Sequence, residues 1–266
     1  MLSFVATCLL LATLTGGEVI LSAGIGGYNN SQLFDQLRRF ETYSQLGAIS
    51  GTSLLLYGIG SGGVLTETRT APGAMTANEF GLIVKEKTGL PLYATIYCDE
   101  SWGACSPLGE HLRDLSFNFT YSLLNEATLY GLDGFIIDLE PIETIPYNPT
   151  ARMIEIAQAV APRRFYVWVG DSTPMMVSLL EAASQVVDNL YIIAMNTYGD
   201  TPQGLVSDAQ QLARKANRTL VGVLESSWYS GSDIQLICTG LKKYHVGLSI
   251  WASIINGTWI NELRGC

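Results

Sequence analysis

The sequence predicts an α/β protein with a single domain, a (β/α)8 TIM barrel. Three observations predict it: short apolar runs alternate with longer amphipathic stretches, eight of the runs have the length of strands, and no linker interrupts the pattern. Strands that alternate with helices form right-handed βαβ units, and eight such units close into a barrel. An open, doubly wound sheet is the alternative, but Gly24, Gly26 and Gly27 lack the G-x-G-x-x-G spacing of its first turn.

The expected elements follow one another in a regular order. The strands are residues 18–24, 52–57, 92–97, 134–140, 165–169, 190–195, 220–224 and 246–251. The helices are residues 32–46, 76–88, 110–130, 150–161, 174–187, 203–216 and 232–243, with room for a short eighth near the C-terminus. Pro149 and Pro174 stand near helix starts, where a missing N–H does no harm, and Gly89 ends a helix just before the third strand.

Composition excludes several classes of protein. The chain has 266 residues, of which 48% are hydrophobic and 15% are charged, and this indicates a well-packed globule rather than a disordered chain. A chain of this length buries a large core without metal ions, and we expect a monomer with no cofactor. The formal net charge of −9 repels phosphate backbones, so nucleic acid is not an expected partner, whereas a neutral sugar is indifferent to it.

The N-terminal segment has the pattern of a secretory signal. Residues 1–14 are apolar, and small residues follow up to Gly17. The run is too short to span a membrane, and although no basic residue precedes it, we expect a signal peptide over residues 1–17 and a secreted domain over residues 18–266. A buried first strand is the alternative, but a separate strand candidate follows at once. Sequons for N-glycosylation stand at Asn29, Asn118, Asn217 and Asn256.

The cysteines suggest disulfides. Cys8 lies in the expected leader, which leaves four cysteines and three possible connectivities. We expect Cys98–Cys105, which would close a short loop, and Cys238–Cys266, which would tie down the C-terminus. Their spacing is wrong for zinc, so no metal site is expected. Four buried free thiols are the alternative if the chain stays in a reducing compartment.

The segment from Asp133 to Glu140 carries the strongest chemical signal. Its side chains alternate across a strand, so the apolar residues at odd positions face the helices, and Ile136, Asp138 and Glu140 face the barrel interior. Barrel enzymes place catalytic groups at the C-terminal ends of their strands. A carboxylate neighbour raises the pKa of one acid, which is what a general acid requires. A structural pair that caps a neighbouring loop is the alternative.

This segment resembles the D-G-x-D-x-D-x-E signature of family 18 glycoside hydrolases, the chitinases and their relatives. The resemblance implies that Glu140 protonates the glycosidic oxygen and that Asp138 orients the substrate's N-acetyl group, whose oxygen is the nucleophile. Asp133 matches the first Asp of the signature and is expected at the substrate site. The middle Asp is Ile136 here, and its loss should alter the pKa of Asp138 and lower activity.

Two distant segments strengthen the resemblance. The last strand ends in Trp251, as in the family, where this Trp forms the floor of the sugar pocket. Residues 191–198 resemble the sixth strand of the family, where a Met and a Tyr point into the pocket. Met195 matches the Met, and Tyr198 or Thr197 takes the Tyr position because the spacing is one residue longer. We favour Tyr198, with Asn196 as an extra polar contact.

Several functions compete at this point. Tyr57, like other aromatic residues at strand ends, is expected to stack on a sugar. The first hypothesis is a glycosidase that acts with retention on β-1,4-linked N-acetylglucosamine, in chitin or in the chitobiose core of N-glycans. The second is a chitinase-like lectin or storage barrel without turnover, which Ile136 favours. The third is a protein-binding barrel, such as an inhibitor, that binds no sugar.

Overall fold

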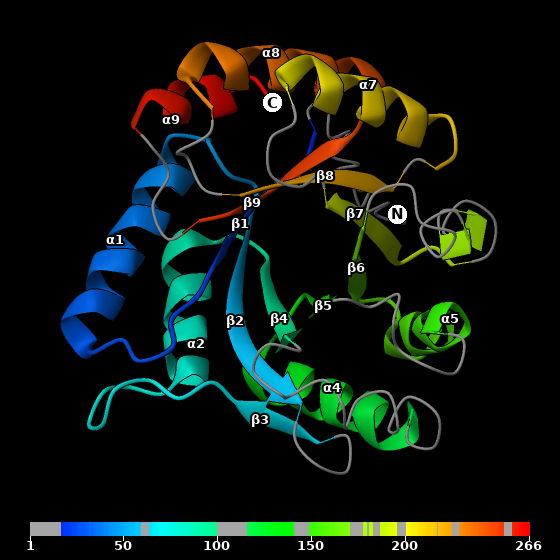
Figure 1. Cartoon of the computed structure of the whole chain (residues 1–266). Coiled ribbons are helices and arrows are strands. Elements are labelled where there is room, and N and C mark those ends of the chain that lie inside the picture. The colour runs from blue at the N-terminus through cyan, green and yellow to red at the C-terminus, as the bar shows by residue number, and fades with distance from the viewer. Residues whose placement is uncertain are drawn as a thin grey trace, which may run out of the picture.

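A computed structural model of the chain shows a closed parallel β-barrel surrounded by helices (Figure 1). It describes residues 17–59, 64–99, 116–140, 149–170, 178–179, 181–182, 187–195, 201–216, 218–224, 229–252 and 257–266. The predicted leader over residues 1–17 lies almost wholly outside these ranges. No helix in the described ranges is long and apolar enough to cross a membrane.

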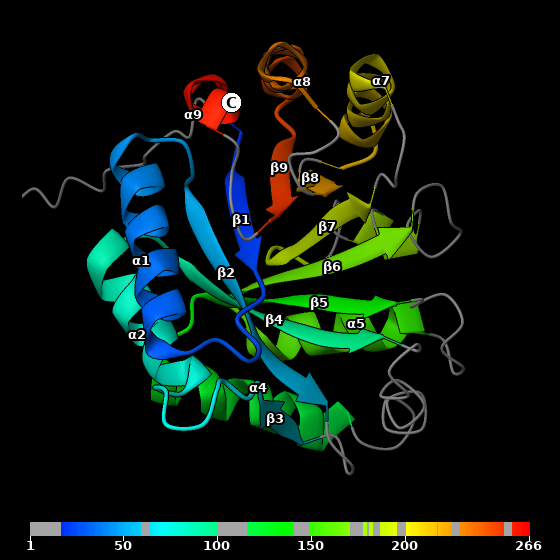
Figure 2. The same ribbon diagram turned by 60° about the vertical axis from the view of Figure 1, so that its left-hand side comes forward.

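Eight parallel strands form the barrel, and all eight were predicted from the sequence. They are β1 (Val19–Ala23), β2 (Gly51–Ile59), β4 (Leu92–Asp99), β5 (Gly134–Glu140), β6 (Arg164–Gly170), β7 (Leu190–Met195), β8 (Thr219–Leu224) and β9 (Gly247–Trp251). Strand β1 pairs in parallel with both β2 and β9, and this closes the barrel. Figure 2 shows β4, β5 and β6 side by side with their arrowheads at the same end. A ninth strand, β3 (Leu65–Glu67), lies antiparallel to β2 and was not predicted.

The helices lie outside the barrel. They are α1 (Asn30–Gln45), α2 (Ala77–Thr88), α4 (Ser116–Tyr130), α5 (Pro149–Val160), α7 (Pro202–Ala213), α8 (Gly231–Tyr244) and α9 (Gly257–Leu263). Helix α5 begins at Pro149 and α2 ends at Gly89, whose φ of 66° is the left-handed conformation that glycine adopts readily, so both boundary predictions are confirmed. Of the predicted helix over 174–187, the described residues 178–179 and 181–182 are helical.

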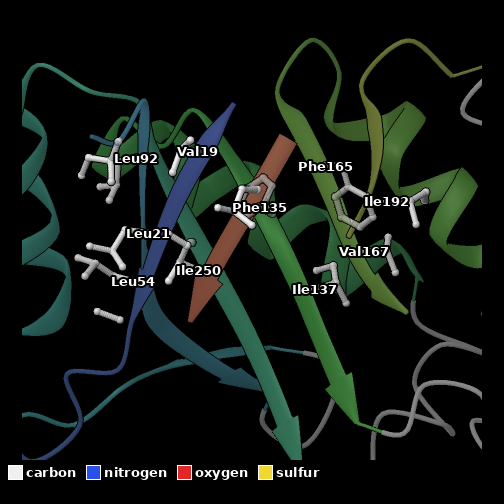
Figure 3. Close-up of a cluster of buried hydrophobic side chains, with 14 of the residues drawn as sticks. Val19, Leu21, Leu54, Leu92, Phe135, Ile137, Phe165, Val167, Ile192 and Ile250 are labelled. Atoms are coloured by element: carbon white, nitrogen blue, oxygen red, sulfur yellow. The ribbon is translucent and has the colours of Figure 1, made fainter. Parts of the chain in front are cut away.

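The main core lies between the barrel and the helices. Phe135 and Ile137 of β5 belong to it and are fully buried beside Phe165 and Val167 of β6 (Figure 3). The predicted outward face of β5 is therefore confirmed at these two positions. Burying each such side chain contributes about 1.5–3 kcal/mol, so this layer supplies much of the stability of the barrel.

A second, smaller core fills the barrel itself. Its buried members are Ile20, Tyr93, Ile136, Tyr166, Trp168, Ile193 and Leu220. They come from β1, β4, β5, β6, β7 and β8, and they show which residues of each strand face inward. Ser22 comes two residues after Ile20 on β1 and therefore faces inward as well. Ser249 pairs with Ile20, and Trp251 pairs with Ser22, so both of these residues also face inward.

A charged cluster lies in the barrel near the N-terminal ends of the strands. The Arg164 guanidinium is ion-paired with the carboxylate of Glu18, whose side chain is only 13% exposed. The hydroxyls of Tyr166 and Tyr93 donate to the same carboxylate over 2.9 and 3.1 Å. Burial raises the pKa of both tyrosines well above the ordinary value, so their hydroxyls stay protonated and keep donating. We name these four residues the lower cluster.

One disulfide joins Cys238 of α8 to Cys266, 28 residues further along, as predicted. The carbonyl oxygen of Cys266 also accepts a hydrogen bond of 2.8 Å from the N–H of Gly17. The bridge therefore lies where the chain enters β1 and where it ends. The predicted Cys98–Cys105 bridge involves Cys105, which lies outside the described residues.

Strand β5 enters the barrel through a glycine that leaves no room for a side chain. A Cβ atom at Gly134 would lie 2.2 Å from the carbonyl oxygen of Arg164 on the paired strand. We expect Gly134→Ala to lower the free energy of unfolding by about 3 kcal/mol, at the upper end of the range for overpacking, because backbone atoms are in the way. Chemical denaturation measures this loss. Gly58→Ala on β2 is the control, since its Cβ would meet no atom of the described residues within 4 Å, and equal losses in both variants would contradict the explanation.

Candidate functional site

The candidate site lies on the inner face of β5, at its C-terminal end. Asp138 is 7% exposed, and its backbone pairs with that of Tyr97 on β4. Glu140 is the last residue of β5 and pairs with Asp99, the last residue of β4. The structure describes only the backbone of Glu140, and two residues of strand place its Cα on the same face as that of Asp138. Asp138 and Glu140 therefore share one inner ridge, at the end where barrel enzymes place their catalytic groups.

The residue two positions before Asp138 has an apolar environment. Ile136 is fully buried inside the barrel, where its strand neighbours are Thr95 and Tyr166. The family signature has a carboxylate at this position, whereas in this chain the side chain at the same position is part of the hydrophobic core. Asp138 thus has no carboxylate neighbour at that position of its own strand, and no proton can be shared there.

Trp251 and Met195 lie on strands that reach the same end of the barrel. Trp251 is the last residue of β9, half-buried, and pairs with Ser22 and Leu224 on the two adjacent strands. Met195 is the last residue of β7, and the structure describes its backbone alone. Asn196 and Tyr198 lie outside the described residues. The strand ends that carry Asp138, Glu140, Met195 and Trp251 are thus brought together at one end of the barrel.

Tyr57 does not line this site, and the structure corrects that prediction. Its side chain is 1% exposed and lies in the outer core, where its hydroxyl donates to Asn78 Oδ1 over 2.5 Å and lies 3.1 Å from Glu126 Oε2. The cause is an irregularity in β2 between Leu55 and Tyr57, where one extra residue shifts the pairing with β4. A bulge of this kind turns every later side chain to the other face.

Asp133 is also placed away from the site. It precedes β5, at the opposite end of the strand from Glu140. Its Oδ2 atom accepts a hydrogen bond from the Leu92 N–H and an ion pair from Lys85, each at 2.8 Å. Asp133 therefore links α2, β4 and β5 at the N-terminal end of the barrel, a structural role instead of the predicted contact with substrate.

A set of small hydroxyl side chains lies inside the barrel, and these residues were not predicted from the sequence. They are Ser22, Ser53, Thr95 and Ser249, all fully buried. Ser53 Oγ and Thr95 Oγ1 are 2.6 Å apart and hydrogen-bonded, whereas the Oγ atoms of Ser22 and Ser249 have no partner among the described residues. The sequence pattern that would have predicted them is a small hydroxyl residue at an inward position of an otherwise apolar strand.

A separate cavity of about 360 Å³ lies outside the barrel interior, along the segment that joins β3 to α2. Its lining residues are Glu67, Thr68, Arg69, Thr70, Pro72 and Thr76. None of them is among the residues that the sequence predicted for the site. Glu67 and Thr76 accept hydrogen bonds from backbone N–H groups in the first turn of α2, so the cavity lies beside the N-terminus of this helix.

Fold and strand order define the class of this protein as a (β/α)8 barrel of the kind found in family 18 chitinases and chitinase-like proteins. A chitinase of this family from Pseudoalteromonas aurantia superposes with a TM-score of 0.65 and 16% identity, over 92% of this chain and 97% of that one. The spore cortex-lytic enzyme SleL of Bacillus cereus has a TM-score of 0.70 at 10% identity, over 94% of this chain and 74% of that one.

A third similar structure is that of an agglutinin. It is the chitinase-like agglutinin of Robinia pseudoacacia, with a TM-score of 0.64 at 10% identity, over 91% of this chain and 98% of that one. The sequence itself matches no protein-family model and no curated protein. At these identities the likeness concerns the fold, and the fold is shared by hydrolases and by an agglutinin.

Proposed function

We propose that this chain is a glycoside hydrolase of the chitinase or endo-β-N-acetylglucosaminidase type, which cleaves β-1,4-linked N-acetylglucosamine. The observation that carries the proposal is the buried Asp138, on the inner face of β5 two residues before Glu140, at the C-terminal end of the strand. An acidic pair in this position suits a reaction that needs one proton donor and one anchor for a polar substrate group. The shared fold of chitinases supports the same reading.

In the proposed mechanism the substrate supplies its own nucleophile. Glu140 donates a proton to the glycosidic oxygen as the bond to the anomeric carbon breaks, and the acetamide oxygen of the same sugar bonds to that carbon. Asp138 holds the acetamide N–H and stabilises the positive charge that develops on the ring formed. Glu140 then takes a proton from water, which opens the ring with net retention of configuration. Trp251 lies under the sugar, and Tyr198 contacts the acetamide.

A secreted location would fit this substrate. Residues 1–17 have the pattern of a leader, and the Cys238–Cys266 bridge belongs to a type of cross-link that persists mainly in oxidising compartments. Chitin and the chitobiose core of N-glycans are both found there. The net charge of −9 does not oppose a neutral glycan.

Product analysis tests the proposal directly. The purified protein is incubated with chitotetraose and with an N-glycosylated protein, and the products are followed by mass spectrometry and by NMR of the anomeric proton. We expect shorter chitooligosaccharides, or a released glycan, that carry the β-anomer first, as retention requires. Recovery of both substrates intact, after long incubation at high protein concentration, would refute hydrolysis.

A chitinase-like lectin is the second candidate, and Ile136 is the specific observation that favours it. A fully buried isoleucine stands where the family signature has a proton-sharing carboxylate. Calorimetric titration with chitotetraose separates the two candidates, because a lectin binds the oligosaccharide and leaves it unchanged. Absence of any binding would exclude both and would leave the protein-binding barrel.

A further inference from the structure

Trp168 has an unusual position for a core tryptophan. It lies on β6 and its indole belongs to the inner core of the barrel, with only 5% of the residue exposed. Its Nε1 atom is buried and has no hydrogen-bond partner among the described residues. Burying a donor without a partner lowers the stability of the fold by about 1–3 kcal/mol. If this side chain served packing alone, we would expect its N–H to be hydrogen-bonded, or a phenylalanine to stand at this position.

Trp259 provides the comparison within the same chain. It is a fully buried residue of α9, outside the barrel, and its Nε1 donates to the carbonyl oxygen of Tyr229 over 2.9 Å. The indole N–H of Trp259, in the helical layer, thus has an acceptor. The indole N–H of Trp168, inside the barrel, has none within the part of the chain that the structure describes.

The barrel is built to hold the Trp168 ring across its interior. A Cβ atom on Gly222 of β8 would lie 2.4 Å from Cζ3 of the indole and 2.7 Å from its Cη2. The ring therefore reaches from β6 past β7 to the backbone of β8, and it rests in the space that a glycine leaves open. Gly170, the next inward position on β6, adds no side chain between the indole and the C-terminal end of the barrel.

Trp168 lies on β6, the strand that pairs with β5, which carries the candidate catalytic ridge. Strands β5 and β6 pair at Ile136 with Tyr166 and at Ile137 with Val167, and Asp138 and Trp168 are the next residue of each strand. Ile193, which pairs with Trp168, and Leu220, which pairs with Ile193, belong to the same inner core. The buried hydroxyl of Ser249, on the strand paired with Gly222, also lacks a partner among the described residues.

We propose that Trp168 lines the glycan site from the barrel interior, in addition to Trp251, and that its indole N–H donates a hydrogen bond to an oxygen atom of the bound N-acetylglucosamine unit. This inference rests on the proposed function and adds a residue that determines affinity for the sugar. A sugar offers hydroxyl and acetamide oxygens as acceptors, and the flat indole offers an apolar surface beneath them. Binding then gives the buried donor an acceptor that no described residue of the barrel supplies.

Calorimetry on inactive protein tests the inference. Chitotetraose is titrated into Glu140→Gln, in which the ligand stays intact, and into the same protein with Trp168→Phe or Trp259→Phe added. We expect Trp168→Phe to raise the Kd by about 3- to 10-fold, as the loss of one neutral hydrogen bond implies, and Trp259→Phe to leave it unchanged. Gly222→Ala, which pushes the indole out of place, should weaken binding further, whereas Gly58→Ala should not.

The outcomes separate the inference from the function on which it rests. An unchanged Kd in both Trp168→Phe and Gly222→Ala, with chitotetraose still bound, overturns the role of Trp168 and leaves the proposed function intact. Equal weakening by Trp168→Phe and Trp259→Phe also overturns it, because the effect would then be one of general packing. No binding to Glu140→Gln at all overturns both. If Trp168→Phe does not fold, the comparison of Gly222→Ala with Gly58→Ala decides.

Discussion

Replacing Glu140 with glutamine is expected to lower the turnover of a chitooligosaccharide by about 10²–10⁴-fold, the usual contribution of a general acid. Glutamine keeps the size and polarity of the side chain but has no proton to give to the leaving oxygen. The substitution lies at the end of β5, so we expect the Kd for the oligosaccharide and the melting temperature to stay close to those of the parent protein. Hydrolysis of a fluorogenic chitooligosaccharide measures the loss.

Glu155→Gln is the matched control for this experiment. Glu155 lies on α5, is about half exposed, and is ion-paired with Arg152 over 2.6 Å on the outer surface. The same chemical change there should leave turnover unaltered. Equal rates for wild type and Glu140→Gln would rule out the assigned acid, even if the protein hydrolysed the substrate.

Replacing Arg164 with leucine is expected to lower the free energy of unfolding by about 2–4 kcal/mol, because it leaves the Glu18 carboxylate in the barrel without its counter-charge. The value falls below that of a fully buried pair because the Arg164 side chain is 34% exposed and water partly screens its charge. Urea denaturation followed by fluorescence measures the loss.

Arg38→Leu is the control for the lower cluster. Arg38 is ion-paired with Asp35 on α1, and both side chains are about half exposed or more, so its loss should cost less than about 1 kcal/mol. The lower cluster lies at the opposite end of the barrel from Asp138, so turnover per folded molecule should be the same in Arg164→Leu and wild type. A large fall in turnover with unchanged stability would contradict this separation of roles.

The barrel could be predicted from the sequence because each strand carries a local signal. Apolar runs of strand length, separated by stretches of helical periodicity, correspond to all eight barrel strands, and Gly134–Glu140 and Leu190–Met195 have the predicted bounds. Strand β3 was missed because three residues are too few to show a period, and none of them is fully buried.

The face of a side chain was harder to predict than the strand itself. Alternation correctly placed Ile136 and Asp138 inside the barrel, since nothing interrupts β5. The expectation for Tyr57, which rested on its place at a strand end, was wrong, because the irregularity after Leu55 depends on the pairing between β2 and β4 and has no mark in the sequence. Asp133 was assigned to the site through the family signature, although its position before β5 places it at the other end of the barrel.

Trp168 was overlooked for a related reason. Residues 165–169 are apolar or aromatic at every position, so their pattern does not say which of them face inward. The position of the indole is revealed only by the register with β5 and by the space that Gly222 leaves open two strands away in the sheet order. Such information is non-local and appears once the barrel has closed.

The pairing of β1 with β9 has a consequence for how the protein is made. Because β1 leaves the ribosome before β9, the seam between them stays open until β9 has been synthesised. During that interval the unpaired backbone edges of β1 and β8 are exposed to other nascent chains. Closure of the barrel therefore depends on keeping these edges away from other chains until β9 can pair with both of them.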